Sequence, residues 1–140
     1  MDSSSNSQFK GIAKNYLKNV HGVVLVFDLT NKQSFESLNN WIKLVKENIH
    51  NSSCMILVGN KLDLRDNVEV SSDIARNKAN SIGVEYIETS AKTNVNVDSI
   101  FESLTITIFN VFGVKEKHDL RKKDSIDNNS DSNTGSCQIQ

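Results

Sequence analysis

The chain has few cysteines, almost no net charge and no long apolar run, and each shortage excludes a class of protein. Its two cysteines lie in different settings, Cys54 inside an apolar segment and Cys137 fourth from the last residue. They do not form a disulfide framework, which favours a reducing, intracellular setting. Sixteen basic residues against 17 acidic ones give a net charge of −1, so the charge gives no reason to expect nucleic-acid binding.

Metal-binding clusters, membrane spans and secretion signals are also missing from the sequence. The three histidines are scattered, and no His/Cys cluster has metal-site spacing. No apolar run approaches the roughly 20 residues of a membrane span. Residues 1–7 have neither a charged nor an apolar region of the kind found in a signal peptide. The 140 residues are enough for one domain with a real core and too few for two ordinary ones.

Helical and strand patterns alternate along the chain. Apolar residues at three- and four-residue steps predict helices over residues 9–20, 32–49, 72–81 and 97–112. Continuous apolar runs predict strands covered on both faces over residues 23–27 and 54–58, with a short strand at 84–87. Such alternation predicts an α/β fold with about three parallel strands and flanking helices. Residues 113–140 contain hardly any apolar residue, so we expect them to be a disordered tail.

The second apolar run leads directly into a polar loop. Residues 54–58 are followed by Gly59, Asn60, Lys61 and, after Leu62, Asp63. Open α/β sheets bind their ligands at the carboxyl ends of their strands. The sequence therefore predicts a ligand site here, and Ser-Ala-Lys at residues 90–92 takes the same place after the next strand.

These two loops together resemble those of the small GTPases of the Ras superfamily. Asn-Lys-Leu-Asp (60–63) follows one strand, and Ser-Ala-Lys (90–92) follows the next, 27 residues after Asp63. Val-Phe-Asp-Leu-Thr (26–30), Ser34-Phe35 and Trp41 are similar to the Rab branch. The resemblance covers about residues 8–112. It implies a truncated, three-layer P-loop NTPase fold, with a partial small GTPase domain over residues 1–112.

The resemblance gives the first loop the role of selecting guanine. Asp63 would accept hydrogen bonds from the guanine ring N–H and its exocyclic amine, a donor pair that adenine lacks. Asn60 would bind the base and tie the loop together, and Lys61 would lie along the base plane. The alternative for residues 60–63 alone is an ordinary turn; the second motif and the strand context weigh against it.

The second loop completes the base site in the same resemblance. The backbone N–H of Ala91 would donate to the guanine carbonyl, Ser90 would brace the loop, and Lys92 would cover the ring. GTP or GDP is therefore the expected cofactor, and a guanine nucleotide is the expected partner.

The glycine loop that holds phosphates in this family is absent from the 140 residues. No Gly-x4-Gly-Lys-[Ser/Thr] segment occurs, so neither its lysine nor its Mg²⁺-binding hydroxyl is present. Residues 1–8 align with the family's Trp-Asp-Thr-Ala-Gly-Gln-Glu-Arg, where Asp2 matches but Ser5 replaces Gly and Asn6 replaces the catalytic Gln. The alternative is serine-rich filler. Either way we expect weak or lost nucleotide binding, no preserved Mg²⁺ site, no catalytic residue and no GTP hydrolysis.

The same absence has a structural cost. In the family the strand matching residues 23–27 pairs with the strand that feeds the phosphate loop, and Lys61 packs against that loop. We therefore expect an open apolar strand edge and a marginally stable chain unless a partner covers the edge.

The last four residues, Cys-Gln-Ile-Gln, fit a C-a-a-X box that would place a farnesyl group on Cys137. A diluted basic cluster lies upstream, at Lys115, Lys117, Arg121, Lys122 and Lys123. One lipid plus such a cluster gives reversible attachment, so we expect a cytoplasmic protein, peripheral on the cytosolic face of a membrane. The alternative is a chance cysteine at this position.

Three functional interpretations stay open. The first is a truncated Rab-like protein of the vesicle-trafficking and signalling class that keeps guanine recognition and lacks the phosphate half. The second is a membrane-tethered, non-hydrolysing pseudo-GTPase whose helices over residues 9–20 and 32–49 contact Rab-type effectors or regulators. The third is an incomplete gene model of a full GTPase, which the DNA upstream of Met1 would reveal. None predicts a nucleic-acid partner.

Overall fold

The computed structural model describes residues 17, 20–49 and 54–113. The chain divides into two units, residues 1–108 and 109–140, and of the second only the π-helical turn Phe109–Gly113 (η3) is described. Residues 1–8, nearly all of the predicted helix over 9–20, and the tail with Cys137 lie outside the described residues. Of that helix, Leu17 is helical and packs against the main core.

Three parallel strands in the order β1-β2-β3 form the sheet of the first unit. They are β1 (Val23–Asp28), β2 (Met55–Asn60) and β3 (Glu85–Glu88). The register pairs Asp28 with Asn60 and Gly59 with Glu88, so the polar carboxyl ends of all three strands meet at one edge. The predicted α/β fold with three parallel strands is confirmed.

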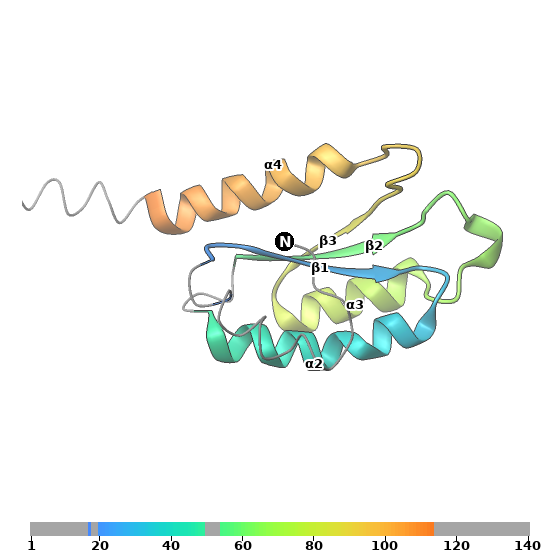
Figure 1. Ribbon diagram of the computed structural model, residues 1–140, viewed down its shortest axis with the longest axis horizontal. Coiled ribbons are helices and arrows are strands. Elements are labelled where there is room, and N and C mark those ends of the chain that lie inside the picture. The colour runs from blue at the N-terminus through green and yellow to red at the C-terminus, as the bar shows by residue number, and fades with distance from the viewer. Residues whose placement is uncertain (1–16, 18–19, 50–53, 114–140) are drawn as a thin grey trace, which may run out of the picture. The chain divides into compact units, whose positions relative to one another are not determined.

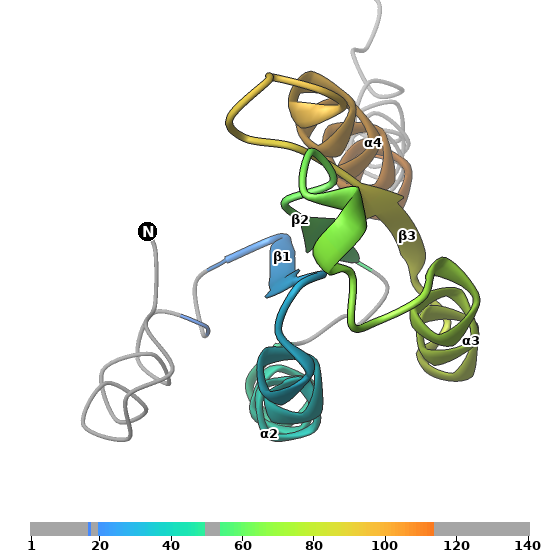
Figure 2. The same cartoon turned by 90° about the vertical axis from the view of Figure 1, so that its right-hand side faces the viewer.

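Helices cover both faces of this sheet (Figures 1 and 2). Helices α2 (Lys32–Asn48) and α3 (Ser72–Ile82) lie on one face and α4 (Val97–Ile108) on the other, while a 3-10 turn, η2 (Arg65–Asn67), precedes α3. Asn31 accepts a hydrogen bond from Ser34 N–H at the start of α2, and Ser71 caps α3. Gly83, at φ 73°, ends α3 in the left-handed conformation that glycine adopts most readily.

Strand β2 is the centre of the core. Its first four residues are 0–2% exposed, because alternate side chains enter two hydrophobic clusters. Met55 and Leu57 pack in the cluster beneath α2 and α3, and Ile56 and Val58 pack with Ile100 of α4. The prediction that this strand is covered on both faces is confirmed.

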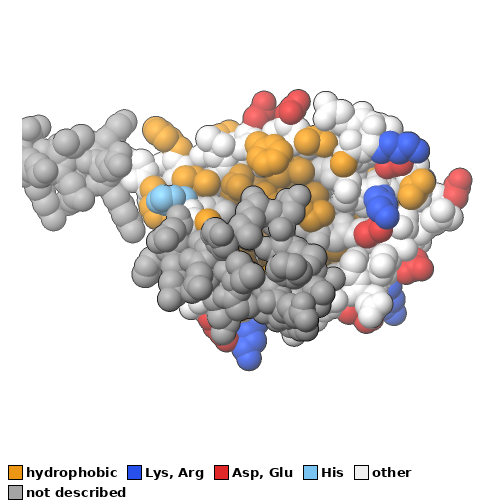
Figure 3. All heavy atoms as spheres, viewed as in Figure 1, with side chains coloured by type: hydrophobic (Ala, Val, Ile, Leu, Met, Phe, Trp, Pro, Cys, Tyr) orange, Lys and Arg blue, Asp and Glu red, His pale blue; other side chains and the backbone are white. Residues whose placement is uncertain are grey.

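Strand β1 is covered mainly on one face, so the prediction of full coverage is wrong there. Leu25 and Phe27 are buried in the larger cluster, whereas the side chain of Val26 is 56% exposed. The reason is that Ile100 of α4 packs on Ile56 and Val58 of β2. Within the described residues β1 is also an edge strand, as expected. Figure 3 shows hydrophobic side chains gathered over α4 on the face in view.

Other boundaries and faces differ from the predictions in detail. Strand β2 continues through Gly59 to Asn60, and α4 ends at Ile108, where the π-helical turn begins. Ile74 and Phe101, apolar residues of the helices predicted over residues 72–81 and 97–112, are 54% and 59% exposed. Ile74 directly precedes the buried Ala75, and Phe101 directly follows the buried Ile100. One residue along a helix is a rotation of about 100°, so the neighbour of a buried residue can face outward. Within the described part of the chain, no helix is both long and apolar enough to cross a membrane.

Candidate guanine-binding site

The loops after β2 and β3 are joined through their backbones. Thr89 N–H donates to Gly59 O at 2.8 Å, and Leu62 N–H donates to Thr89 O at 2.9 Å. Gly59 leaves room for the Tyr86 side chain, because a Cβ there would lie 2.7 Å from the hydroxyl oxygen of Tyr86. The structure thus brings residues 60–63 and 89–92 side by side.

Asp63 and Ser90 form the closest side-chain contact between the loops. Ser90 Oγ donates to Asp63 Oδ1 at 2.6 Å and accepts from Thr93 N–H at 3.2 Å, and Ser90 is 1% exposed. The Ser90 hydrogen bond lowers the pKa of Asp63 despite a smaller opposing effect of desolvation, and the charges of Lys92 and Lys61 add to the lowering. Asp63 is therefore ionised at neutral pH, and its Oδ2 makes no hydrogen bond to another described residue.

An open pocket of about 330 Å³ lies beside this carboxylate, lined by Leu62, Asp63, Arg65, Ser90, Thr93 and Val95. Val95 pairs with Ser90 through two backbone hydrogen bonds of 3.1 Å, which close the loop after β3 into a tight turn. An ionised acceptor in a pocket built on rigid strand ends suits a ligand that presents adjacent N–H donors.

Asn60 ties the two loops together from the other side. Its Oδ1 accepts from the Ala91 N–H at 3.1 Å and from Thr89 Oγ1 at 3.5 Å. The resemblance assigns the Ala91 N–H to the guanine carbonyl, but here this donor is engaged by Asn60. A base carbonyl would have to share it or displace Asn60 Oδ1.

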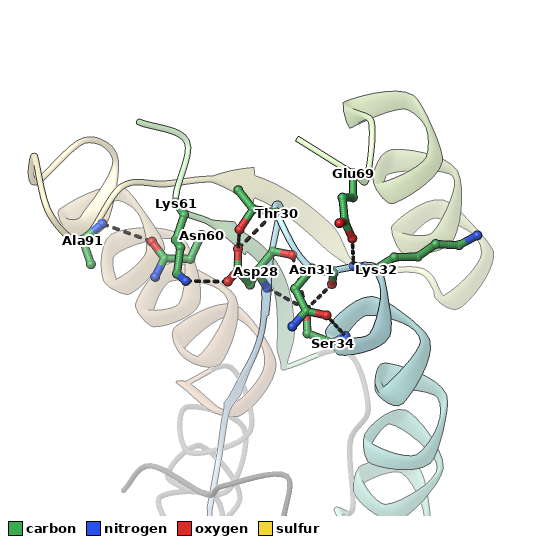
Figure 4. A network of polar contacts seen from close by, with 9 residues as sticks. All are labelled: Asp28, Thr30, Asn31, Lys32, Ser34, Asn60, Lys61, Glu69 and Ala91. Carbon is green, nitrogen blue, oxygen red and sulfur yellow. Dashed lines mark hydrogen bonds and ion pairs between the residues drawn. The ribbon is translucent and has the colours of Figure 1, made fainter. Parts of the chain in front are cut away.

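Lys61 reaches toward the end of the neighbouring strand β1. Its backbone is left-handed, at φ 69°, and its Nζ lies 2.6 Å from Asp28 Oδ2 (Figure 4). Asp28 Oδ1 accepts from Thr30 N–H at 2.8 Å and Thr30 Oγ1 at 2.7 Å. Burial by itself raises the pKa of Asp28, but hydrogen bonds from Lys61 and Thr30 outweigh it and hold that pKa below its usual value.

The start of α2 joins the same network. Asp28 N–H donates to Ser34 Oγ at 3.0 Å, which fixes the strand end against the first turn of α2. Glu69, in the loop before α3, accepts from Lys32 N–H at 2.8 Å through Oε2 (Figure 4). The Glu69 N–H donates to Leu29 O at 2.9 Å. Three loops at the carboxyl edge of the sheet are therefore linked.

Asp28, Thr30 and Asn96 were missed as site residues by the sequence analysis. The sequence analysis used Asp28 and Thr30 only as part of a Rab-like segment. Asp28 also ends an apolar strand, and a polar loop after an apolar strand is the pattern that predicted the ligand site after residues 54–58. Asn96, at φ 58°, donates through Nδ2 to Glu88 O at 2.8 Å and holds the end of β3. Nothing in its sequence context indicates that bond.

Among the residues that the structure describes, no group of three or more His, Cys, Asp or Glu side chains is placed to hold a metal ion. We assign no Mg²⁺ ligand and no step of a reaction to these residues.

The candidate site lies at the carboxyl ends of parallel strands. Sequence comparison gives the family. The Ras family model matches residues 1–110, so the chain belongs to the Ras family of small GTPases.

Its relatives place it in the Rab branch. It is 34% identical to Ras-related protein Rab-13 of Bos taurus over 140 residues, which is 99% of this chain and 69% of that protein. It is 32% identical to GTP-binding protein YPTM1 of Zea mays over 76% of this chain, and 34% identical to Rab-8A of Gallus gallus over 74% of it. These last two matches span 51% and 50% of the relatives' own lengths.

Proposed function

We propose that this chain binds the guanine base of GDP and GTP between residues 60–63 and 90–92. The observation that carries the proposal is the ionised Asp63, fixed by Ser90 beside an open pocket and retaining an oxygen that makes no hydrogen bond to another described residue. Guanine presents an N–H and an amine side by side, and one carboxylate accepts from both. Adenine would leave the charge unpaired, which is the costlier outcome.

The other motif residues take supporting roles in this proposal. Asn60 and Ala91 hold the two loops together through their 3.1 Å hydrogen bond. Lys61 and Lys92 lie near enough to lower the pKa of Asp63, and their aliphatic stems would cover the two faces of the base. Ser90 sets the direction of the carboxylate.

The 140-residue polypeptide is proposed to bind nucleotide weakly and not to hydrolyse GTP. The sequence contains no Gly-x4-Gly-Lys-[Ser/Thr] segment, and backbone N–H groups of such a loop provide much of the phosphate affinity in P-loop proteins. With base contacts alone, we expect a dissociation constant on the order of 1 mM.

An NMR titration of ¹⁵N-labelled polypeptide tests this proposal. GDP should shift the amide signals of residues 60–63 and 90–92, and ADP at equal concentration should not. Asp63→Ala should abolish the GDP effect, while Asp98→Ala, an exposed carboxylate on α4, should preserve it. Equal shifts with GDP and ADP would contradict guanine recognition. Tight Mg²⁺–GTP binding with turnover would contradict the weak, non-hydrolysing state.

Membrane attachment is the remaining part of the proposal. A farnesyl group on Cys137 would hold the protein on the cytosolic face of a membrane, where Rab-type effectors or regulators could meet it. Mass spectrometry of protein from a eukaryotic host should show a prenyl mass on Cys137 and loss of residues 138–140. A Cys137 thiol with residues 138–140 intact would refute attachment by this route.

A further inference from the structure

We propose that Asp28 is a positioning residue for guanine recognition: it holds Lys61 in place beside the base site, and Thr30 holds Asp28. The inference rests on the proposed function, because it concerns the same site. It extends that site from two loops to three, by adding the end of β1.

The geometry of the carboxylate supports this role. Asp28 uses both of its oxygens, Oδ2 for Lys61 Nζ at 2.6 Å and Oδ1 for the two Thr30 donors at 2.8 and 2.7 Å. Its backbone is fixed as well, because its N–H donates to Ser34 Oγ and its Cα is in register with Asn60. The carboxylate thus cannot turn away from Lys61 without losing bonds to Thr30.

Lys61 needs such an anchor. Its side chain is 50% exposed, and a lysine side chain without a partner loses rotamer entropy when it is ordered. Its left-handed backbone directs the stem from the first loop toward β1, as Figure 4 shows. Because the Lys61 ammonium is already paired with Asp28, the lysine side chain is ordered before a ligand binds. Its aliphatic stem then provides a preorganised surface for a flat base.

The network also explains why the anchor lies on β1. Asp28 and Asn60 are opposite each other at the carboxyl ends of adjacent strands, and Leu29 N–H donates to Asn60 O at 3.0 Å. The distance from the base-binding loop to Asp28 is therefore set by sheet hydrogen bonds. A partner on a mobile segment would not fix Lys61 in this way.

A double-mutant cycle with GDP as the probe tests the inference on the full 140-residue chain. We expect Asp28→Asn to weaken GDP binding about three- to fivefold, the range of a partly exposed ion pair. In a Lys61→Ala background the same substitution should have no further effect, since the group that Asp28 positions is gone. A purely structural role of Asp28 would instead weaken binding equally in both backgrounds.

A matched control is available on α2. Glu47→Gln removes the carboxylate of a different lysine–carboxylate pair, Lys43 and Glu47 at 4.0 Å, and should leave GDP binding unchanged. If Asp28→Asn does not fold, Thr30→Val, which deletes the 2.7 Å donor, replaces it in the cycle.

The outcomes separate the two proposals. Unchanged or tighter GDP binding by Asp28→Asn, with the preference for GDP over ADP retained, overturns this inference alone. Equal losses with and without Lys61 also overturn it. A lack of any GDP preference in the unmodified chain overturns the proposed function and this inference together.

Discussion

Replacing Ser90 by alanine should loosen the guanine loop and change the ionisation of Asp63. Ser90 is 1% exposed, and its hydroxyl serves two partners, Asp63 Oδ1 at 2.6 Å and Thr93 N–H at 3.2 Å. Without the hydroxyl, the Thr93 N–H loses a hydrogen bond that contributes about 0.5–1.5 kcal/mol to stability. We therefore expect Ser90→Ala to lower the free energy of unfolding by about 1 kcal/mol.

The effect on Asp63 has a defined sign. The Ser90 hydrogen bond is the largest cause of its lowered pKa, so the variant should show a higher pKa for Asp63. A lowered folded-state pKa stabilises the fold above the unfolded-state pKa, and this contribution is lost as the pH falls through the folded-state pKa. The variant should accordingly lose less stability than the parent does as the pH falls below about 4.

Two measurements check these expectations. Urea unfolding followed by the fluorescence of Trp41 gives the stability at each pH, and ¹³C NMR of the carboxyl carbon gives the pKa of Asp63. Ser99→Ala, an exposed serine on α4 with no side-chain hydrogen bond among the described residues, is the control. If Ser90→Ala matched the parent in both the pKa of Asp63 and the stability, the bracing role of Ser90 would be refuted.

Four further predictions follow from the fold. Leu57→Ala, at a fully buried position of β2, should cost about 2–5 kcal/mol of unfolding free energy in urea titrations; a loss below about 1 kcal/mol would contradict the described core. Gly59→Ala should lower the free energy of unfolding by about 1–3 kcal/mol and broaden the NMR signals of residues 60–63, because the added Cβ meets the Tyr86 hydroxyl. Unchanged NMR signals would show that Tyr86 does not pack tightly against residue 59. Val26→Lys should change stability by less than about 0.5 kcal/mol and reduce self-association in light scattering, since Val26 is exposed on an edge strand; a large destabilisation would mean that this face is covered. Asp28→Asn should reduce the loss of unfolding free energy below about pH 4, because the pKa of Asp28 is lowered in the fold. The same loss of stability in acid as in the parent would contradict that lowering.

The order of elements and the place of the site followed from local patterns. The run at residues 54–58 has no polar interruption, and a polar loop after such a strand marks the carboxyl edge of a parallel sheet. Capping was predictable to within one residue, because Asn31 and Ser71 are good N-caps directly before amphipathic segments.

Side-chain partners and exposed faces were less predictable, since they depend on register and on neighbouring elements. The contact of Asp28 with Lys61 exists because β1 and β2 align Asp28 with Asn60, which no local pattern specifies. The sequence of β1 reads as buried on both faces, yet the exposure of Val26 is decided by where α4 packs. Ile74 and Phe101 show the same limit, because one-residue errors in a helical face turn an inward residue outward.

Changing the base preference through Asp63 tests guanine recognition most directly. Xanthine carries a carbonyl where guanine carries its amine, so the amide of an Asp63→Asn variant could donate to that carbonyl while accepting from the ring N–H. We expect the parent chain to prefer GDP over xanthosine diphosphate and Asp63→Asn to reverse this preference by about tenfold or more. The same preference in both chains, or no preference in the parent, would contradict the assignment of Asp63 as the residue that selects guanine.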